Sequence, residues 1–219
     1  MTSSMTLPPR FKKTDRRALS DVSGAELREE DTRTAERFDG DDLTGRDLSD
    51  ATFDRCELIG VGLHEADLSG ASILDTRLVR VNAPILRASR SVWHDSIVED
   101  SRIGSAELYD STWRGIRFEN CKLGYLNLRG SQLRDVRFAN CLIDELDLGD
   151  ATATRVAFVD TTIRKLDLTH ATLSSVDFRQ ADLRQIASVE SLRGATLNGI
   201  QLADLAPAFA ARFGIVVED

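Results

Sequence analysis

Residues 36–75 read in fives as ERFDG DDLTG RDLSD ATFDR CELIG VGLHE ADLSG ASILD, with an apolar residue at the centre of every five. This spacing continues without insertion or deletion from Phe38 to Leu183, so thirty consecutive fifth positions are apolar in a chain that is only 42% apolar. Neither simple element explains a period of five, because fifth residues spread around an α-helix and alternate between the faces of an uninterrupted strand. The chain must therefore bend once in every five residues to keep the same side chain pointing inward.

A second inward position lies two residues before each centre, where small or apolar residues recur, as at Ala51, Cys56, Val61, Ala66 and Ala71. Residues two apart in an extended chain point the same way, so both positions should line the interior. The residue between them is mostly polar and is expected to face water. The two remaining residues of each five are often Gly, Asp, Asn or Ser, which suit a corner.

Like residues also recur every twenty positions, which sets the number of corners in one coil. One such series contains only large apolar residues: Phe38, Leu58, Leu78, Val98, Phe118, Phe138, Phe158 and Phe178. Four five-residue sides therefore make one coil, and the predicted fold is an all-β solenoid of square cross-section. Thirty sides make about 7.5 coils, which at about 4.8 Å between coils form a rod about 36 Å long.

Several fives carry a family resemblance: ADLSG (66–70), LDLGD (146–150), LDLTH (166–170) and ADLRQ (181–185). They resemble the pentapeptide-repeat signature, in which a small residue, Asp or Asn, Leu or Phe, a small polar residue and any residue recur. The resemblance implies a right-handed quadrilateral β-helix of pentapeptide repeats. It specifies the fold much more closely than the function, because one fold supports many functions.

The sequence divides into three parts. Residues 1–17, rich in Ser, Thr, Pro and basic residues, are expected to be disordered. Residues 18–185 are expected to form the β-helix with its N-terminal lead-in, and the regular repeats cover 36–185. Residues 186–219 break the register and are predicted to form a short C-terminal α-helical cap, with apolar residues at helical spacing: Leu202, Leu205, Phe209 and Phe213. In the pentapeptide-repeat family such caps often build a twofold dimer, so these four are candidate homodimer contacts; a cap without a dimer is the alternative.

The sequence offers no catalytic constellation, and the protein is expected not to be an enzyme. The three histidines occupy outward or corner positions on three different sides, and the glycines stand singly at corners rather than in a phosphate-binding loop. All three cysteines fall on the inward small position. Cys121 and Cys141 lie one coil apart, where a disulfide or a metal pair is the alternative to the small buried thiols that we favour. We therefore expect no cofactor and no metal site.

Charge and composition narrow the partners and the compartment. The net charge is −8, from 28 basic and 36 acidic residues, which argues against direct nucleic-acid binding. The N-terminal stretch has basic residues but no apolar run, and nowhere do 18 apolar residues follow one another, so neither a signal peptide nor a membrane span is expected. A cytoplasmic protein is the default expectation.

The candidate partner-binding surface is a ladder of carboxylates on one side of the rod, which Arg87 and Arg90 interrupt. This acidic stripe consists of outward residues at twenty-residue spacing and of corner residues beside them: Asp47, Asp67, Glu107, Asp147 and Asp167, with Asp50, Asp110 and Asp150. Aspartate also belongs to the repeat signature, so one interpretation is that these residues only solvate the coil or order its corners. The other is that a rod with regular carboxylates acts as a mimic of duplex DNA in shape and charge.

Pentapeptide-repeat proteins of the fluoroquinolone-resistance kind act in this second way, as dimers in the DNA-binding saddle of DNA gyrase. The resemblance therefore implies a non-enzymatic protein-binding rod that binds gyrase or another type II topoisomerase and modulates its activity or its quinolone sensitivity. The net charge of residues 36–185 is only −7, so electrostatic steering should be moderate. The alternative is an interaction scaffold for a different, non-topoisomerase protein partner.

Overall fold

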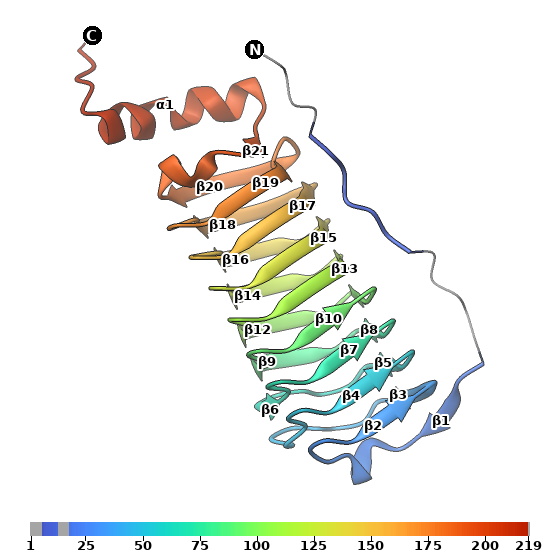
Figure 1. Ribbon diagram of the computed structural model, residues 1–219. Helices are drawn as coiled ribbons and strands as arrows, with labels where there is room; N and C mark the ends of the chain where they lie inside the picture. Colours follow the sequence, from blue (N-terminus) through green and yellow to red (C-terminus); the bar gives the residue numbers. More distant parts are fainter. Residues whose placement is uncertain (1–5, 13–17, 219) are drawn as a thin grey trace.

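The computed structural model describes residues 6–12 and 18–218, and its main body is a rod of stacked coils (Figure 1). Two parallel sheets wrap the rod. The larger has fourteen strands: β1 (Ser20–Val22), β2 (Thr32–Thr34), β3 (Glu36–Asp39), β4 (Thr52–Asp54), β5 (Glu57–Ile59), β7 (Ser72–Leu74), β8 (Arg77–Val79), β10 (Val92–His94), β11 (Ile97–Glu99), β13 (Thr112–Glu119), β15 (Gln132–Ala139), β17 (Thr152–Val159), β19 (Thr172–Asp177) and β21 (Ala195–Thr196). The smaller has seven: β6 (Ala66–Asp67), β9 (Asn82–Arg87), β12 (Arg102–Glu107), β14 (Lys122–Asn127), β16 (Leu142–Asp147), β18 (Thr161–Asp167) and β20 (Ala181–Ala187).

Neighbouring coils pair with a shift of twenty residues through the repeats. Phe118 in β13 lies between Val98 in β11 and Phe138 in β15, and in the smaller sheet Leu126 pairs with Leu146. Each sheet therefore supplies two sides of the square. The period read from the sequence is the stacking register, and the predicted all-β solenoid of square cross-section is confirmed.

The apolar ladder forms the interior of the rod. Each centre from Phe38 to Phe178 is buried, and Leu183, in the last regular coil, is partly buried. On one side the phenylalanine rings stack face to face, with centroids 5.0 Å apart between Phe118 and Phe138 and 5.1 Å apart between Phe138 and Phe158. Burying each large apolar side chain of the ladder contributes about 1.5–3 kcal/mol, so the whole ladder stabilises the rod and the stacked rings are one part of it.

Corners are made by single residues in the left-handed region of backbone conformation. Three corner rows use them along the regular repeats, as at Arg55, Gly60 and Gly70 in one coil. Asp and Asn fill many of the non-glycine positions, because their short polar side chains tolerate positive φ better than other residues do. The repeat's preference for Gly, Asp and Asn at corners therefore has a backbone cause.

The fourth corner row changes its construction along the rod. Gly45 and Glu65 are left-handed there, but from Ile85 onward this corner is an extended strand, so β9 and the following strands of the smaller sheet run straight through it. Close stacking accompanies the change: a Cβ atom on Gly104 would lie 2.3 Å from the carbonyl oxygen of Pro84. Position 104 therefore needs glycine because a larger residue would not fit, and not because of its backbone φ angle.

The C-terminal end is closed by a short 3₁₀ turn, η2 (Val189–Leu192), by β21 and by helix α1 (Gly199–Phe213), which lies across the end of the rod (Figure 1). The Asn198 side chain caps the helix and reaches back to the carbonyl of Arg179 at 2.9 Å. The buried Gln201 amide donates to the carbonyls of Phe178 and Ala181, each at 2.7 Å. The predicted helical cap is confirmed, and its polar side chains satisfy backbone groups that the last coil leaves without a strand partner.

At the other end of the chain, residues 6–12 form an extended segment, the N-terminal arm, that lies along the rod. The main-chain N–H of Arg10 donates to Asp135 at 2.9 Å, and the hydroxyls of Thr6 and Thr196 share a hydrogen bond. Composition, from which disorder is expected over 1–17, does not register contacts with residues more than a hundred positions away. Residues 1–5 and 13–17 lie outside the described part of the chain.

Candidate protein-binding surface

The outward members of the acidic stripe form one continuous ladder on the smaller sheet. The Cα partners along it are Asp47, Asp67, Arg87, Glu107, Asn127, Asp147 and Asp167, in that order. Asp50, Asp110 and Asp150 stand at the left-handed corner beside this ladder. The structure therefore brings all eight predicted residues onto one side of the rod, with Arg87 between them.

Several of these aspartates also shape their own corners. The carboxylate of Asp47 accepts hydrogen bonds from the N–H and the hydroxyl of Ser49, at 3.0 and 2.7 Å, and Asp167 accepts the same pair from Thr169. The hydrogen bonds from the Ser49 side chain and backbone hold the pKa of Asp47 below its ordinary value. The local role of the signature aspartate is thus real, and in Asp47 and Asp167 both bonds go to Oδ1, so Oδ2 takes no part in the corner.

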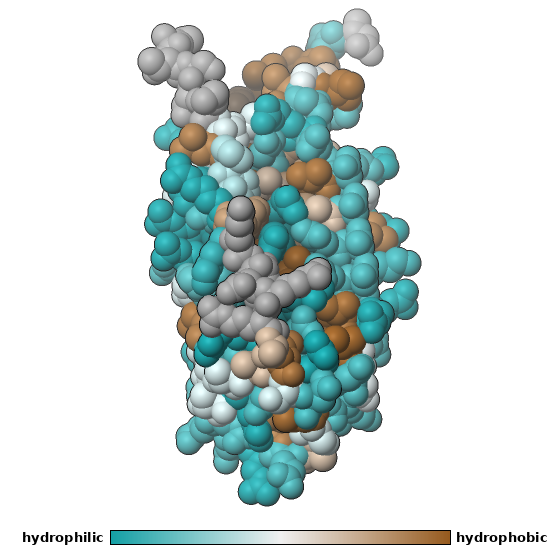
Figure 2. All heavy atoms as spheres, turned by 90° about the vertical axis from the view of Figure 1, so that its right-hand side faces the viewer, coloured by the Kyte–Doolittle hydropathy of each residue, from teal (hydrophilic) through white to brown (hydrophobic). Residues whose placement is uncertain are grey.

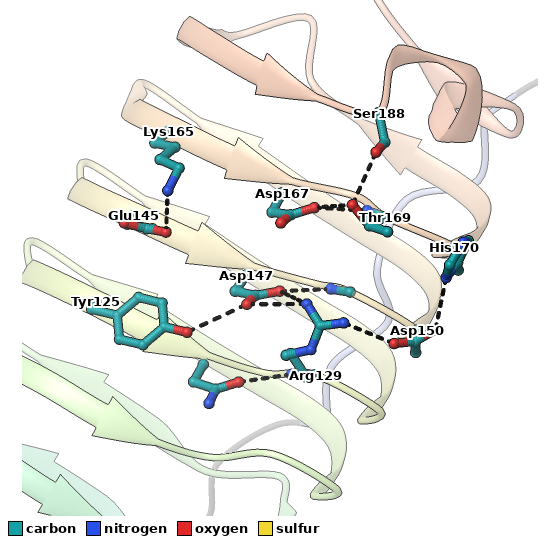
Figure 3. Close-up of polar contacts among 12 residues, drawn as sticks. Tyr125, Arg129, Glu145, Asp147, Asp150, Lys165, Asp167, Thr169, His170 and Ser188 are labelled. Carbon is teal, nitrogen blue, oxygen red and sulfur yellow. Dashed lines mark hydrogen bonds and ion pairs between the residues drawn. The ribbon is translucent and has the colours of Figure 1, made fainter.

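In the C-terminal half of the stripe, Arg129 neutralises two carboxylates (Figure 3). Its guanidinium lies 3.2 Å from Asp147 and 2.9 Å from Asp150, and the attraction to Asp147 raises the pKa of Arg129. Asp147 is buried and also accepts hydrogen bonds from the Tyr125 hydroxyl at 3.3 Å and the Gly149 N–H at 2.9 Å. Asp147 therefore serves as a structural anion rather than as a displayed charge.

Gly149 makes this arrangement possible. A Cβ atom at position 149 would lie 2.3 Å from Nη1 of Arg129, so the guanidinium occupies the space that a side chain would fill. The sequence carried the signal, since Arg129 and Gly149 stand in the same row one coil apart. The pairing itself was missed, because spacing alone does not show which way a long side chain folds.

Two further contacts flank this half of the stripe. Lys165 lies 2.7 Å from Glu145, and the hydrogen bond between them raises the pKa of Lys165. The imidazole of His170 lies 3.3 Å from Asp150 (Figure 3). The C-terminal half is therefore a mixed surface of paired charges.

The N-terminal half of the stripe has a different character. Within residues 6–12 and 18–218, no ion pair involves its five carboxylates: Asp47, Asp50, Asp67, Glu107 and Asp110. Four of them are exposed and Asp67 is half-buried. Unpaired carboxylates are thus displayed mainly at this end of the stripe, on both sides of the exposed Arg87 and Arg90.

The four candidate dimer contacts separate into two pairs. Leu205 and Phe209 are partly buried and pack against the core, so they hold the cap in place. Leu202 and Phe213 are 55% and 73% exposed. Further exposed apolar residues that the candidate set lacked lie near them: Ile200, Ile215, Val216 and Val217. The apolar run after Gly214 was the sequence signal for Ile215, Val216 and Val217, and Figure 2 shows apolar residues gathered at this end of the rod.

The interior offers little room for chemistry. An apolar cavity of about 10 Å³ between Trp93, Trp113 and neighbouring leucines is no larger than the smallest cavity that can hold one water molecule. The three cysteines are buried and free, and burial raises the pKa of the Cys56 thiol. Among the described residues no group of three or more His, Cys, Asp or Glu side chains is arranged to hold a metal ion.

No helix in the described part of the chain is long and apolar enough to cross a membrane.

Comparison with known proteins agrees with this architecture. The family model for pentapeptide repeats matches in eight copies, over residues 42–82 and 147–185. Among curated protein sequences none matches this chain significantly. Residues 42–82 and 147–185 are thus pentapeptide repeats, and the same coil geometry of five residues per side continues between them.

Solved structures with a similar fold include the pentapeptide-repeat protein HetL, involved in heterocyst differentiation regulation in the cyanobacterium Nostoc, at 17% identity and a TM-score of 0.34, covering 79% of this chain and 92% of HetL. Full-length QnrB1, a plasmid-mediated fluoroquinolone resistance protein, is similar at 15% identity and a TM-score of 0.31, covering 84% of this chain and all of QnrB1 (100%). Identities and scores of this size support no inference about what this chain binds.

Proposed function

We propose that this protein is a non-enzymatic protein-binding rod that uses its acidic stripe to bind DNA gyrase or another type II topoisomerase at the enzyme's DNA-binding surface. Bound there, the rod competes with DNA and so modulates the enzyme's activity or its quinolone sensitivity. The observation that carries the proposal is the displayed negative charge in the N-terminal half of the stripe. Because gyrase acts on chromosomal DNA, the proposal places the protein in the cytoplasm.

The spacing of the stripe sets the expected strength of the mimicry. The ladder repeats once per coil, about every 4.8 Å, whereas duplex DNA carries one negative charge per about 1.7 Å of its axis. Even with the corner aspartates added, the rod is less densely charged than DNA. We therefore expect binding that is salt-sensitive but weaker than that of a DNA duplex of equal length.

A supercoiling assay with purified gyrase tests the proposal. The triple variant D47K/D67K/E107K reverses three displayed charges and should raise the concentration needed for half-inhibition at least about tenfold. The matched control is D39K/D100K/D160K, which makes the same charge change with exposed residues outside the stripe and should change inhibition by less than about threefold.

Two results would reject the topoisomerase proposal: no effect of the native protein on supercoiling at micromolar concentration and low salt, or equal weakening by both triple variants. In the first case the rod would instead be a scaffold for a different protein.

We further propose that α1 and the tail form a twofold homodimer. Exposed apolar residues gathered in this way mark an interaction site, and a twofold contact pairs one such patch with its own copy. The double variant L202D/F213D should reduce the sedimentation mass from two chains to one. Val92, an exposed apolar residue on the side of the rod, provides the control V92D, which should leave the mass unchanged. A native protein that sediments as one chain would exclude the dimer.

A further inference from the structure

The N-terminal arm crosses the coils instead of joining a sheet. Its contacts begin at Thr196 beside the cap, continue at Asp135 and end at Asp75, where the ammonium of Lys12 lies 3.6 Å from the carboxylate. The arm runs along the right-hand side of the rod in Figure 1, the side that faces the viewer in Figure 2. Its partners belong to the larger sheet or its corners, whereas the acidic stripe lies on the smaller sheet.

Three groups on the rod recognise different features of the arm. The Asp135 carboxylate accepts a main-chain N–H, which depends on an extended backbone rather than on one side chain. The guanidinium groups of Arg117 and Arg137 each lie 5.5 Å from the centroid of the Phe11 ring, within range of a cation–π contact. Asp75 attracts the ammonium group of Lys12, the residue that follows Phe11. Together they match an aromatic residue with a basic residue after it.

The receiving groups are held in place by the rod itself. Arg155 binds Asp135 through two hydrogen bonds of 2.6 Å, with side chains only 12% and 8% exposed. Burial on its own raises the pKa of a carboxyl group, but the hydrogen bonds from Arg155 and the Arg10 N–H and the charge of Arg155 hold the pKa of Asp135 below its ordinary value. Arg137 is fixed by Glu119 at 2.6 Å. Groups fixed in this way bind a peptide with little loss of their own freedom.

The arm, in contrast, is attached only shallowly. Leu7, Pro8, Arg10 and Lys12 are exposed, and Phe11 is only half-buried. Residues 6–12 pair with no strand, so main-chain ladders do not hold them. Pro8 and Pro9 favour the extended conformation before docking, which lowers the entropy that docking costs. An arm with these properties can be exchanged for another segment of the same chemistry.

We propose that the row formed by Asp75, Arg117, Asp135 and Arg137 is a docking site for an extended segment of a partner protein, in which prolines precede an aromatic residue flanked by basic residues, and that the chain's own arm occupies this site in the free protein. The charge of the site fits such a segment, since two aspartates meet its backbone and its basic side chain while two arginines meet its ring. A partner binds by displacing the arm.

The test uses the full-length chain and a fluorescein-labelled peptide with the sequence of residues 6–12, TLPPRFK. The variant F11A removes the ring that holds the native arm, so fluorescence polarisation should show the peptide binding to F11A at least tenfold more tightly than to the native protein. A second arm variant, R10P, removes the N–H donated to Asp135 and should also open the site. Its control is R10A, which keeps the N–H and should bind the peptide as weakly as the native protein does.

One substitution in the docking site and one in the peptide together locate the contact. Adding R137A to F11A should weaken peptide binding at least tenfold, and a peptide with alanine for its phenylalanine should not bind F11A. If the native-sequence peptide binds F11A no better than a scrambled peptide, the site is only a strap for its own arm and the proposal fails. If the native protein sediments with a larger mass that F11A loses, the occupant is the arm of a second copy and the partner proposal is likewise rejected.

This readout is independent of the proposed topoisomerase binding. The stripe lies on the other sheet, so adding D47K/D67K/E107K to F11A should change peptide binding less than about threefold. A larger change would show that the peptide binds the stripe rather than the arm's site, which would overturn the proposal.

Discussion

The two halves of the acidic stripe use the same signature aspartate in different ways. In the N-terminal half, Asp67 is half-exposed, and its carboxylate accepts a hydrogen bond from the Ser69 N–H of its own corner. In the C-terminal half, Asp147 is buried beneath Arg129 and accepts from Tyr125 and Gly149 as well. The repeat thus fixes where a carboxylate stands, while residues in adjacent coils decide whether its charge is displayed.

The largest expected effect comes from removing each aspartate in turn. Asp147→Ala leaves the buried Gly149 N–H and the partly buried Tyr125 hydroxyl without their acceptor, and it should lower the free energy of unfolding by about 2–3 kcal/mol. Asp67→Ala loses one solvent-accessible hydrogen bond and should cost about 0.5–1 kcal/mol. Urea unfolding monitored by circular dichroism gives both values. Equal losses would show that the two halves do not differ in this way.

The next effect is on binding. Arg129→Gln releases Asp147 and Asp150 from their ion pairs, so the C-terminal half should display negative charge as well. At low salt the affinity for gyrase should rise about three- to tenfold, and the free energy of unfolding should fall by about 0.5–1 kcal/mol. Arg102→Gln makes the same charge change at an exposed residue on another side and serves as the control. Equal gains from both variants would indicate a general charge effect.

A smaller effect follows from moving the arrangement to the other half. The double variant S49R/S69G places an arginine and an empty glycine position around Asp67, as Arg129 and Gly149 stand around Asp147. The new ion pair should stabilise the fold by about 0.3–0.5 kcal/mol and weaken gyrase binding about threefold. S49R alone, with Ser69 in place, should give less stabilisation. If the single and double variants are equally stable, the glycine is not what admits the guanidinium.

The smallest expected effect is on the pKa of Asp47. Ser49→Ala removes one of the two donors to Asp47, so the pKa of Asp47 should rise toward its ordinary value. Asp47 has a lowered folded-state pKa, so its contribution to stability is present above the ordinary value and is lost as the pH falls through the folded-state pKa. As the pH falls over this range, the free energy of unfolding of the S49A variant should therefore decrease less than that of the native protein. Carboxyl carbon NMR measures the pKa directly, and Asp167, whose Thr169 is intact, should not change.

The sequence predicted the fold because the interior is periodic. The apolar residues that recur every five positions predict the sides of each coil and the burial from Phe38 to Phe178. Their recurrence every twenty positions predicts the stacking register. The same ladder placed all eight stripe residues on one side. It could not show that Arg129 covers Asp147, because that depends on the path of a long side chain, nor that the fourth corner becomes extended at Ile85.

The arm escaped prediction for a different reason. Residues 6–12 contact Asp75, Asp135 and Thr196, which are distant in sequence, and seven residues contain no period from which such contacts follow. The same limit applies to the cap: helical spacing predicted α1, but not that Leu205 and Phe209 face the rod while Leu202 and Phe213 face away.

The position of the arm has a consequence for folding on the ribosome. The arm is the first described segment to be synthesised, but its most distant contact, Thr196, is among the last. At roughly 5–20 residues per second, Thr196 follows the arm by roughly 10–40 s. Coils can stack on the emerging chain during that time, whereas the arm finds its full set of contacts only after the C-terminal coils have formed. Its docking therefore marks the completion of the rod.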